Sequence, residues 1–353
     1  MRIVVAMSGG VDSSVAAALL AAEGHDVIGL SMQLYDQTRG DVRFGSCCTI
    51  DDLYDARRVA SALGIPHYIV NLERQFGEHV LSNFVGEYTS GRTPIPCVHC
   101  NGDLKFAELA DRARGFGAVA VATGHYARVD RHASGRYRLL RGLDPSKDQS
   151  YFLFTLSQDQ LAQAQFPVGA LTKDDVRTTA RRLGLRVAEK PDSQELCFVA
   201  SGDHAAFVDR NAPEPVGAGV ITDRDGRLLG RHEGTHHFTI GQRKGLGLSA
   251  GVPLYVVDID AADRLVIVGP REALDRTTLT ASQINWISGE APSAPVKATA
   301  RIRYRHREAP ATITPFDTGQ ARVEFDEPQA AIAPGQAVVF YEGDEILGGG
   351  WID

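Results

Sequence analysis

Two short stretches of this sequence have residue types and spacings that could carry out chemistry. The first is SGGVDSS, Ser8 to Ser14, which follows an apolar run and opens an alanine-rich segment. Gly9 and Gly10 let the backbone turn tightly and bring its N–H groups close to an anion, and the N-terminus of the following helix adds unsatisfied donors. Pyrophosphate fits this geometry, because the serine hydroxyls can bind phosphate oxygens and Asp12 could hold Mg²⁺.

Two common nucleotide-binding loops do not match this stretch. It lacks the lysine of a Walker A loop, and the glycine spacing of a dinucleotide-binding loop is absent. The alternative without a binding role is a glycine turn followed by a capped helix. The position of the motif between an apolar strand and an alanine-rich helix favours nucleotide binding.

The second stretch is TPIPCVHCN, which places Cys97 and Cys100 three residues apart. The C-x-x-C spacing serves zinc sites and redox pairs alike, and a zinc site needs further ligands at matching spacing. The other cysteines are the adjacent Cys47 and Cys48, for which no role is evident, and Cys197, which stands alone. The residues therefore leave metal binding, disulfide exchange and nucleophilic attack open.

The bulk composition narrows the class of protein. A chain of 353 residues is long enough for two or three domains. The N-terminus has no basic stretch followed by an apolar region, and no apolar run reaches the roughly 18 residues of a membrane span. We therefore expect a cytoplasmic protein whose thiols are reduced, which favours reactive or metal-binding cysteines. The net charge of −7 argues against a histone-like protein but allows a local basic surface for nucleic acid.

The first 210 residues alternate apolar runs with helical patterns, which predicts a Rossmann-like α/β domain with a doubly wound parallel sheet. Strands are expected at Arg2–Met7, Asp26–Met32, His67–Leu72 and Ala118–His125. Helices are expected at Ser13–Gly24, Asp51–Gly64 and Leu104–Gly115, each closed by its glycine, and at Lys173–Leu183 with Thr172 as N-cap.

Beyond residue 210 the pattern changes to short strands separated by turn signals. We expect two small β-rich domains, at residues 211–275 and 276–353, of which the last is a β-barrel. Its strands are expected at Val296–Arg307, Ala311–Phe316, Ala321–Asp326, Gln336–Gly343 and Glu345–Ile352.

The segment RIRYRHR alternates like a strand, so it would place Arg301, Arg303, Arg305 and Arg307 on one face. Residues 276–353 hold 7 Lys and Arg against 10 Asp and Glu, so these arginines would form a local stripe rather than part of a basic domain. Such a stripe either contacts a polyanion or protects an edge strand from aggregation.

Several motifs together resemble one enzyme family. SGGVDSS is similar to the PP-loop of ATP pyrophosphatases, which cleave ATP between its α and β phosphates and leave AMP on an oxygen of the substrate. GLSM, GRTPIPCVHCN, ATGHYAR, KDQSYFL, KPDSQELCF, FTIGQRKGLGL and RIRYR fall in the order and spacing of the tRNA-specific 2-thiouridylases. The resemblance covers essentially the whole chain. It implies that the wobble uridine of certain tRNAs exchanges its 2-oxygen for sulfur.

The resemblance also implies roles for individual residues. Cys197 would carry a persulfide received from an upstream sulfur donor, and Cys100 would attack and end in a disulfide with Cys197. Target-base positions are Ile95, Pro96 and Cys97, and tRNA contacts are Lys147, Asp148, Gln149, Arg303, Tyr304 and Arg305. ATP, with Mg²⁺, would contact Ala6, Met7, Ser8, Gly9, Gly10, Val11, Asp12, Ser13, Met32 and Gly124.

This chain departs from the commonest family pattern at two positions. Cys97 stands where many members have an acidic residue proposed as a proton carrier, and Ile95 stands where they have asparagine. An alternative to the persulfide route is therefore an iron–sulfur cluster on Cys97, Cys100 and Cys197, which we expect to converge. The rival functions are a PP-loop ligase that adenylates a small metabolite and a nucleotide-sensing protein without turnover.

Overall fold

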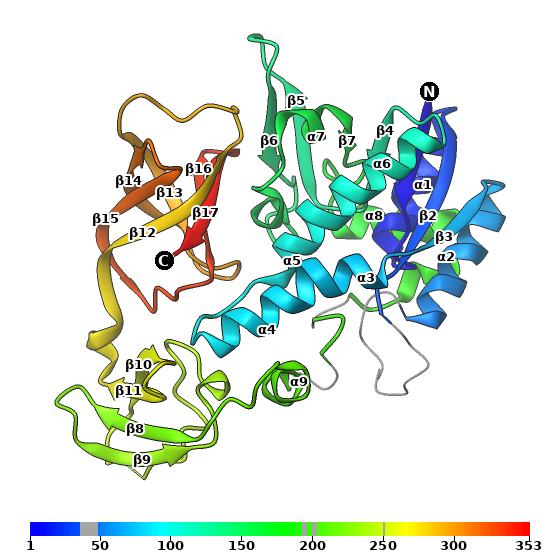
Figure 1. The fold of residues 1–353 in the computed structure, drawn as a ribbon. Coiled ribbons are helices and arrows are strands. Elements are labelled where there is room, and N and C mark those ends of the chain that lie inside the picture. Colours follow the sequence, from blue (N-terminus) through cyan, green and yellow to red (C-terminus); the bar gives the residue numbers. More distant parts are fainter. Residues whose placement is uncertain (36–48, 193–195, 200–202, 250) are drawn as a thin grey trace.

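A five-stranded parallel sheet forms the centre of the first domain (Figure 1). The computed structural model describes residues 1–35, 49–192, 196–199, 203–249 and 251–353. The strand order is β3-β2-β1-β4-β7, with bounds β1 (Arg2–Ala6), β2 (Asp26–Gln33), β3 (His67–Asn71), β4 (Ala120–Ala122) and β7 (Ala164–Gln165). The predicted α/β fold is confirmed, although β7 was not anticipated.

Helices cover both faces of this sheet because both faces are apolar. On β1, Ile3 and Val5 pack with α1 (Val11–Ala22), α2 (Ile50–Leu63) and α8 (Lys173–Arg182). Val4 and Ala6 point to the opposite face, where they join a second cluster with α3 (Glu73–Phe76) and α6 (Leu109–Gly115). This two-sided burial is what an apolar strand in a doubly wound sheet requires.

The predicted helix ends agree with the structure. Thr172 caps α8, since its hydroxyl accepts a hydrogen bond from the Asp175 N–H, and Gly64 ends α2 with a left-handed φ of +68°. α6 ends at Gly115, as predicted, although the left-handed residue that follows it is Gly117 at φ +70°. The helical segment also begins earlier than the predicted Leu104, because α6 continues directly from a π-helical segment, η3 (Cys100–Glu108).

Other elements of the first domain were not predicted from the sequence. They include a hairpin of β5 (Ala127–Arg131) and β6 (Tyr137–Arg141), a π-helical turn η2 (Gly77–Leu81), and the 3-10 turns η4 (Ser150–Leu153) and η5 (Arg186–Glu189). The short helices are α4 (Ser82–Thr89), α5 (Pro96–His99), α7 (Gln158–Gln163) and α9 (His204–Asn211).

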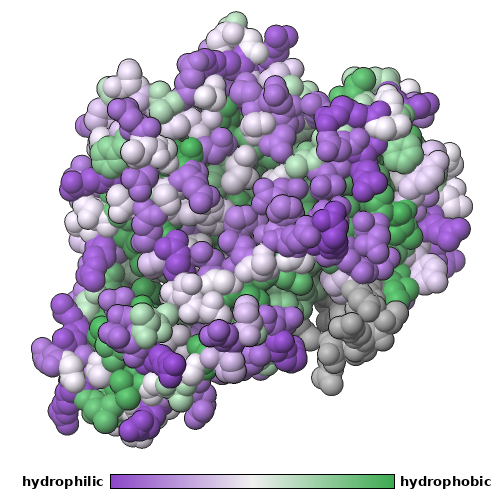
Figure 2. All heavy atoms as spheres, viewed as in Figure 1, coloured by the Kyte–Doolittle hydropathy of each residue, from purple (hydrophilic) through white to green (hydrophobic). Residues whose placement is uncertain are grey.

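The middle module is a small four-stranded sheet. Its order is β10-β11-β8-β9, with bounds β8 (Gly219–Asp223), β9 (Leu228–His232), β10 (Tyr255–Asp260) and β11 (Leu265–Gly269). Ile221, Val256 and Val266 form its fully buried core. A 3-10 turn, η7 (Thr235–His237), lies between β9 and β10, and η8 (Arg271–Leu274) leads to the last domain. Figure 2 shows a largely hydrophilic face, with apolar side chains at the lower left over this module.

The C-terminal domain is a β-barrel, as the sequence predicts, and it is closed by six strands, of which the first was not anticipated. Its strands are β12 (Asp275–Trp286), β13 (Val296–Arg301), β14 (Ala309–Phe316), β15 (Gln320–Ala330), β16 (Ala337–Glu342) and β17 (Glu345–Ile352). They run in the order β12-β15-β14-β13-β16-β17, and pairing of β12 with β17 closes the barrel. The β5–β6 hairpin extends it, because Leu139 and Leu140 of β6 pair with Ile346 and Glu345 of β17.

The predicted strand Val296–Arg307 is wrong beyond Arg301. After β13 the chain bends, and the N–H of His306 donates to the Arg303 carbonyl at 3.0 Å, which is a turn. The bend occurs because Ile302 inserts into the barrel core, where it is 1% exposed, while Tyr304 packs against Phe152 of the first domain with ring centroids 4.4 Å apart. The alternation of the sequence therefore reflects side chains of a turn and not the two faces of a strand.

The described helices do not include one that is both long enough and apolar enough to cross a bilayer.

Candidate active site

The loop that the sequence predicts to bind ATP, Ser8 to Ser14 (the ATP loop), lies where β1 ends and α1 begins, and two glycines let other segments approach it closely. Gly9 has a φ of +74°, and a Cβ there would lie 2.1 Å from the Asp52 carbonyl oxygen. A Cβ on Gly124, which follows β4, would lie 2.5 Å from the Ser13 nitrogen. Glycine is therefore required at both positions, which fixes the loop against α2 and against the end of β4.

The loop serines are partly engaged in holding the loop itself. The Ser8 N–H donates to Ser13 Oγ at 3.2 Å, and the hydroxyls of Ser13 and Ser14 donate to the Gly10 carbonyl at 3.2 and 2.8 Å. Ser13 and Ser14 are buried, whereas Ser8 is exposed. Gly10 is the N-cap of α1 and offers no side chain to the first N–H groups of the helix. The helix N-terminus is thus open to an anion.

Asp12 is the centre of a charged network at the mouth of the loop. Both of its carboxylate oxygens accept hydrogen bonds from Lys173 Nζ at 2.8 Å, and one also accepts from the Tyr126 hydroxyl at 2.8 Å. Burial, together with the neighbouring Asp12, raises the pKa of the Tyr126 phenol, so that it remains a donor. Lys173 is almost fully buried for a lysine, at 10% side-chain exposure.

A second carboxylate, Asp192, joins the same network from the other side. It lies 2.8 Å from Lys173 Nζ and 2.8 Å from Lys147 Nζ, and it accepts from Arg177 at 3.2 Å. Burial by itself raises the pKa of Asp192, but the hydrogen bonds from Lys147 and Lys173 outweigh burial and lower the net pKa. Lys173 therefore bridges the ATP loop and the segment that leads to Cys197.

Lys190 holds the ATP loop in place by hydrogen bonds to the loop and to α2. Its ammonium group donates to the Gly9 carbonyl at 3.1 Å, to Asp52 at 2.6 Å and to Asp55 at 2.7 Å. Burial opposes the charge, but the two carboxylates outweigh burial and raise the pKa of Lys190. One lysine thus joins the loop to the first turns of α2.

The predicted cysteines fall on neighbouring elements. Cys100 opens η3 and Cys197 lies in an irregular segment, and both are half-buried against the apolar cluster that contains Met32, Leu72 and Phe76. Met32, near the end of β2, is itself 7% exposed. Cys97 lies in α5 and is exposed. Cys47 and Cys48 lie outside the described residues.

The described residues give no support for a compact group of metal ligands formed by the three cysteines that we expected to converge. Among the described residues, the group of ligand atoms that all lie within 4.8 Å of one another belongs to Asp209, His236 and His237. The cysteines share a neighbourhood rather than such a cluster: Cys100 and Cys197 pack against one apolar cluster, and Cys97 faces solvent.

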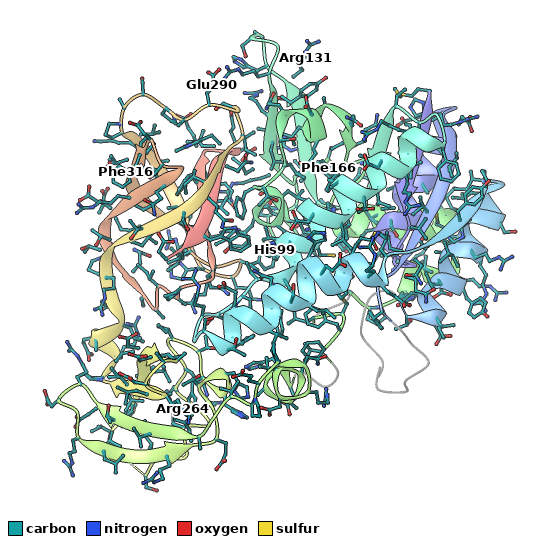
Figure 3. The ribbon with its side chains drawn as sticks, viewed as in Figure 1. His99, Arg131, Phe166, Arg264, Glu290 and Phe316 are labelled. Carbon is teal, nitrogen blue, oxygen red and sulfur yellow. The ribbon has the colours of Figure 1, made fainter. Side chains whose placement is uncertain are left out.

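The segment that carries Cys97 is held by the barrel. Ile95 and Pro96 are buried, and the Gln336 side-chain amide donates to the carbonyls of Thr93 and Pro94 at 3.0 and 3.4 Å. His99, labelled in Figure 3, lies at the junction with the barrel and stacks on Trp351 with ring centroids 4.6 Å apart. The predicted target-base positions thus lie on a short helix fixed by two domains.

The two predicted tRNA-contacting segments lie side by side. Arg301 approaches the Asp148 carboxylate at 3.9 Å, and Tyr304 packs against Phe152. Asp148 is 5% exposed and accepts hydrogen bonds from the N–H groups of Gly142 and Ser150, so its carboxylate organises the turn from within.

The remaining predicted tRNA residues differ in exposure. The Gln149 side chain accepts from the Tyr126 N–H at 3.0 Å. Arg303 is half-buried and donates to the Ala330 carbonyl at 3.3 Å, whereas Arg305 and Arg307 are exposed. The arginines therefore do not share one face, and their tRNA contacts remain predictions.

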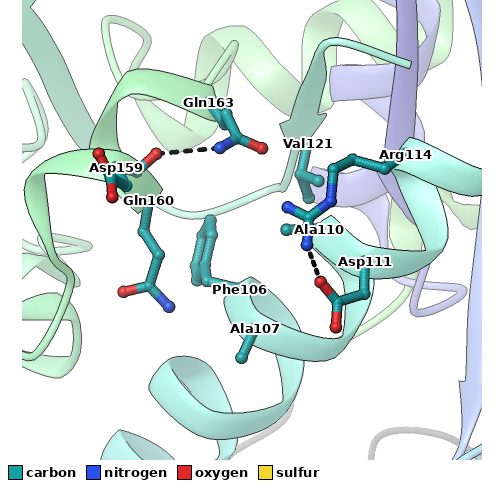
Figure 4. Close-up of a pocket in the computed structure, with 9 residues that line it drawn as sticks. All are labelled: Phe106, Ala107, Ala110, Asp111, Arg114, Val121, Asp159, Gln160 and Gln163. Carbon is teal, nitrogen blue, oxygen red and sulfur yellow. Dashed lines mark hydrogen bonds and ion pairs between the residues drawn. The ribbon is translucent and has the colours of Figure 1, made fainter. Parts of the chain in front are cut away.

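A separate pocket of about 200 Å³ opens between η3, α6 and α7 (Figure 4). Phe106, Val121 and Gln160 are among its lining residues, and the ion pair of Arg114 with Asp111 lies at its rim. Its lining includes none of the predicted site residues.

Comparisons with known proteins agree across the three domains. A family model described as tRNA methyl transferase HUP domain matches residues 1–201, a tRNA methyl transferase PRC-barrel domain model matches residues 205–270, and an aminomethyltransferase beta-barrel domain model matches residues 276–352.

Full-length relatives carry a more specific name. The chain is 54% identical to the tRNA-specific 2-thiouridylase MnmA of Geotalea uraniireducens, over 100% of this chain and 95% of that protein. The proteins of the same name from Geobacter metallireducens and Solibacter usitatus are each 53% identical, over 100% and 99% of this chain and 96% and 99% of their own lengths. The chain belongs to the tRNA-specific 2-thiouridylase family. That family consists of tRNA-uridine 2-sulfurtransferases, and the resemblance stated from the motifs is confirmed.

Sequence reasoning missed several residues of this thiouridylase-family site. Tyr126, Lys190 and Asp192 lie in motifs already quoted, ATGHYAR and KPDSQELCF, but their partners at the loop could not be read from the motifs. Lys173 follows the N-cap of α8, where a lysine is expected to face solvent. Its contact with Asp12 spans 161 residues of sequence, so local pattern held no signal for it.

Proposed function

We propose that this protein thiolates the wobble uridine of tRNA at its 2-position, in an ATP-dependent reaction in the cytoplasm. The observation that carries the proposal is the identity of 54% over the full chain to a tRNA-specific 2-thiouridylase. The geometry is consistent with it, because an anion-binding loop lies at the carboxyl ends of β1 and β4 and the cysteines pack beside the end of β2. The partners are tRNA and an upstream sulfur donor.

In the first step the uridine 2-oxygen attacks the α-phosphorus of ATP. The new O–P bond forms as the bond to the β-phosphate breaks, and pyrophosphate leaves. The open N-terminus of α1 and Lys173 would stabilise the negative charge that moves onto pyrophosphate. Asp12 and Asp192 are oxygen donors of the kind that Mg²⁺ prefers, and with ATP bound they would hold a Mg²⁺ ion that neutralises phosphate charge.

In the second step sulfur replaces the activated oxygen. The terminal sulfur of a Cys197 persulfide attacks C2 of the uridine, and AMP leaves with the original oxygen. The Cys100 thiolate attacks the inner sulfur of Cys197, which breaks the persulfide bond and leaves a Cys100–Cys197 disulfide. A thiol reductant must then restore both thiols before the next turnover.

Exposure supports different roles for the cysteines. Cys100 and Cys197 are half-buried on one apolar cluster, which suits a pair that reacts together away from bulk solvent. Cys97 is exposed on the neighbouring helix turn and is better placed to meet an incoming base than to join a cluster of ligands. The persulfide route is therefore preferred over an iron–sulfur cluster.

The decisive experiment is a single turnover with wobble-uridine tRNA, ATP and persulfidated protein. We expect AMP and 2-thiouridine to form in equal amounts. Cys197→Ser and Cys100→Ser should lose thiolation while still releasing pyrophosphate in the presence of tRNA, and Cys97→Ser serves as the matched cysteine control. Pyrophosphate release that does not depend on tRNA would instead support a ligase of small metabolites, and absence of AMP would support a nucleotide sensor.

A further inference from the structure

A group of potential metal ligands lies outside the ATP loop and away from the cysteine pair. Asp209 belongs to α9 of the first domain, and His236 and His237 belong to η7 of the middle module. One ligand atom from each lies within 4.8 Å of the other two. Figure 1 shows α9 beside the loops of the middle module, so these residues join two domains.

The burial of His236 makes this group unusual. The residue is 1% exposed. Asp209 Oδ1 lies 2.9 Å from His236 Nε2, and among the described residues the other ring nitrogen, Nδ1, has no hydrogen-bond partner. A buried ring nitrogen without a hydrogen bond costs free energy, and such atoms in native proteins normally have a partner. Something other than the described protein atoms should therefore satisfy this ring.

The two other members leave the site accessible. His237 is exposed, and the Asp209 side chain is 52% exposed. The rings of His236 and His237 lie 4.3 Å apart between centroids. A small ion can thus enter from solvent, meet one buried and one exposed imidazole, and keep its remaining coordination positions for water.

We propose that Asp209, His236 and His237 bind a divalent first-row transition metal, with Zn²⁺ as the best match. Two imidazole nitrogens and one carboxylate oxygen are a common three-ligand set for Zn²⁺, with water in the fourth position. Imidazole ligands disfavour Mg²⁺ and Ca²⁺, which prefer oxygen donors. Binding of this ion does not require the proposed thiolation reaction.

The position of the metal gives it a structural role. Its ligands come from α9 and from η7, so the ion would fasten the middle module to the first domain. Phe207 of α9 packs on Phe198, next to Cys197, with ring centroids 5.2 Å apart. On the other side, His204 of α9 stacks on Tyr88 of α4 at 4.7 Å. A metal that holds α9 therefore also steadies the residues that flank Cys197.

The test uses the full-length chain after removal of bound metal with a chelator. Zn²⁺ is titrated by calorimetry, and thermal unfolding is followed with and without Zn²⁺. Co²⁺ replaces Zn²⁺ in a parallel spectrum, because thiolate ligands give a charge-transfer band that histidine and carboxylate ligands lack. The variants are Asp209→Asn and His237→Gln, which change exposed side chains and should leave folding intact. Asp225→Asn and His132→Gln are the matched exposed controls.

We expect the parent and both controls to bind about one Zn²⁺ at this site and to unfold at a higher temperature with Zn²⁺ present. Asp209→Asn and His237→Gln should each weaken Zn²⁺ binding by at least about tenfold and lose the thermal shift. Any thiolate band in the Co²⁺ spectrum should be the same in the parent and in these two variants, because the proposed ligands are histidine and carboxylate. Equal Zn²⁺ affinity in parent and variants, no binding by the parent, or binding removed only by cysteine replacement would each overturn the proposal.

Discussion

At the residue scale, Lys173 connects the parts of the ATP site. It lies between Asp12 of the loop and Asp192 of the segment that leads to Cys197, at 2.8 Å from each. An arriving phosphate can compete with either carboxylate for the Lys173 ammonium group. The loop and the cysteine segment are thereby linked through one ammonium group.

Replacing Lys173 by methionine should disable adenylation. We expect tRNA-dependent AMP formation to fall about 100-fold or more, because loss of one preorganised donor at a transferring phosphoryl group has effects of this size. The affinity for tRNA should stay close to that of the parent. AMP is measured from labelled ATP and tRNA affinity by filter retention. Lys297→Met, which removes an exposed lysine of β13, is the matched control; parental AMP formation in Lys173→Met would refute this role.

The pKa of Asp192 predicts how stability depends on pH. Burial raises this pKa, but the hydrogen bonds from Lys147 and Lys173 outweigh burial, so the folded-state pKa lies below the ordinary value of 3.8. A carboxyl with a depressed folded-state pKa stabilises the fold above pH 3.8, and this contribution is lost as the pH falls through the folded-state pKa.

We therefore expect Asp192→Asn to be less stable than the parent at neutral pH, with a difference that shrinks as the pH falls below 3.8. The free energy of unfolding in urea, measured for both proteins across the acid range, provides the check. Asp225→Asn, at an exposed carboxylate of the middle module, is the control. A difference between parent and Asp192→Asn that stays constant with pH would show that the ion pairs do not stabilise the fold.

At the element scale, the ATP loop keeps its shape through close contact between segments. Gly9 meets the start of α2, Gly124 meets the start of α1, and Lys190 ties Gly9 to Asp52. The positive φ of Gly9 is therefore only part of the reason for glycine at this position. Gly24 has a similar φ of +80°, but a Cβ there would meet nothing within 4 Å.

Comparing Gly9 with Gly24 separates the cost of a left-handed backbone from the cost of a steric clash. Gly24→Ala should cost about 1 kcal/mol of stability, since only the left-handed backbone is penalised. Gly9→Ala should cost clearly more, because a Cβ 2.1 Å from a backbone oxygen forces the loop away from α2. It should also weaken ATP binding by more than tenfold, which calorimetry measures. Equal stability and equal ATP affinity in the two variants would contradict the role of this contact.

At the scale of the whole molecule, the barrel and the first domain adjoin at the proposed tRNA contacts. The turn after β13 packs on the segment that contains Lys147, so the predicted tRNA contacts from two domains adjoin. Arg305 is the exposed member of the Arg303–Arg305 segment, whereas Arg303 is half-buried and bonded to the barrel backbone.

Arg305→Ala should weaken binding of all substrate tRNAs to a similar extent and reduce the slope of log affinity against log salt by about one, as for a phosphate contact. Arg303→Ala should in addition lower the stability of the barrel, because its hydrogen bond to Ala330 is lost. Binding is measured over a range of salt concentrations, with Arg224→Ala of the middle module as the control. A slope equal to the parent slope would argue against Arg305 as a tRNA contact.

The parts of the site that depend on local pattern could be predicted from the sequence. Around Gly9, Gly10 and Asp12, a strand, a tight turn and a helix follow each other within one short stretch, as the pattern predicts. Contacts between distant segments could not be predicted, as Lys173 with Asp12 illustrates. The arginine segment was misjudged for the same reason, since the burial of Ile302 in the barrel core overrides its alternating pattern.

The pairing of β6 with β17 has a consequence for the order of events during synthesis. Leu139 of β6 pairs with Ile346 of β17. The β5–β6 hairpin is synthesised early, so it can complete this pairing only after β17, one of the last strands, has emerged from the ribosome. The same late segment supplies Gln336, which holds the backbone of Thr93 and Pro94. The first domain can assemble its parallel sheet while translation continues. Cys97 and its neighbours reach their final positions only when the chain is nearly complete, so a nascent or truncated chain would hold the nucleotide loop without a finished cysteine segment.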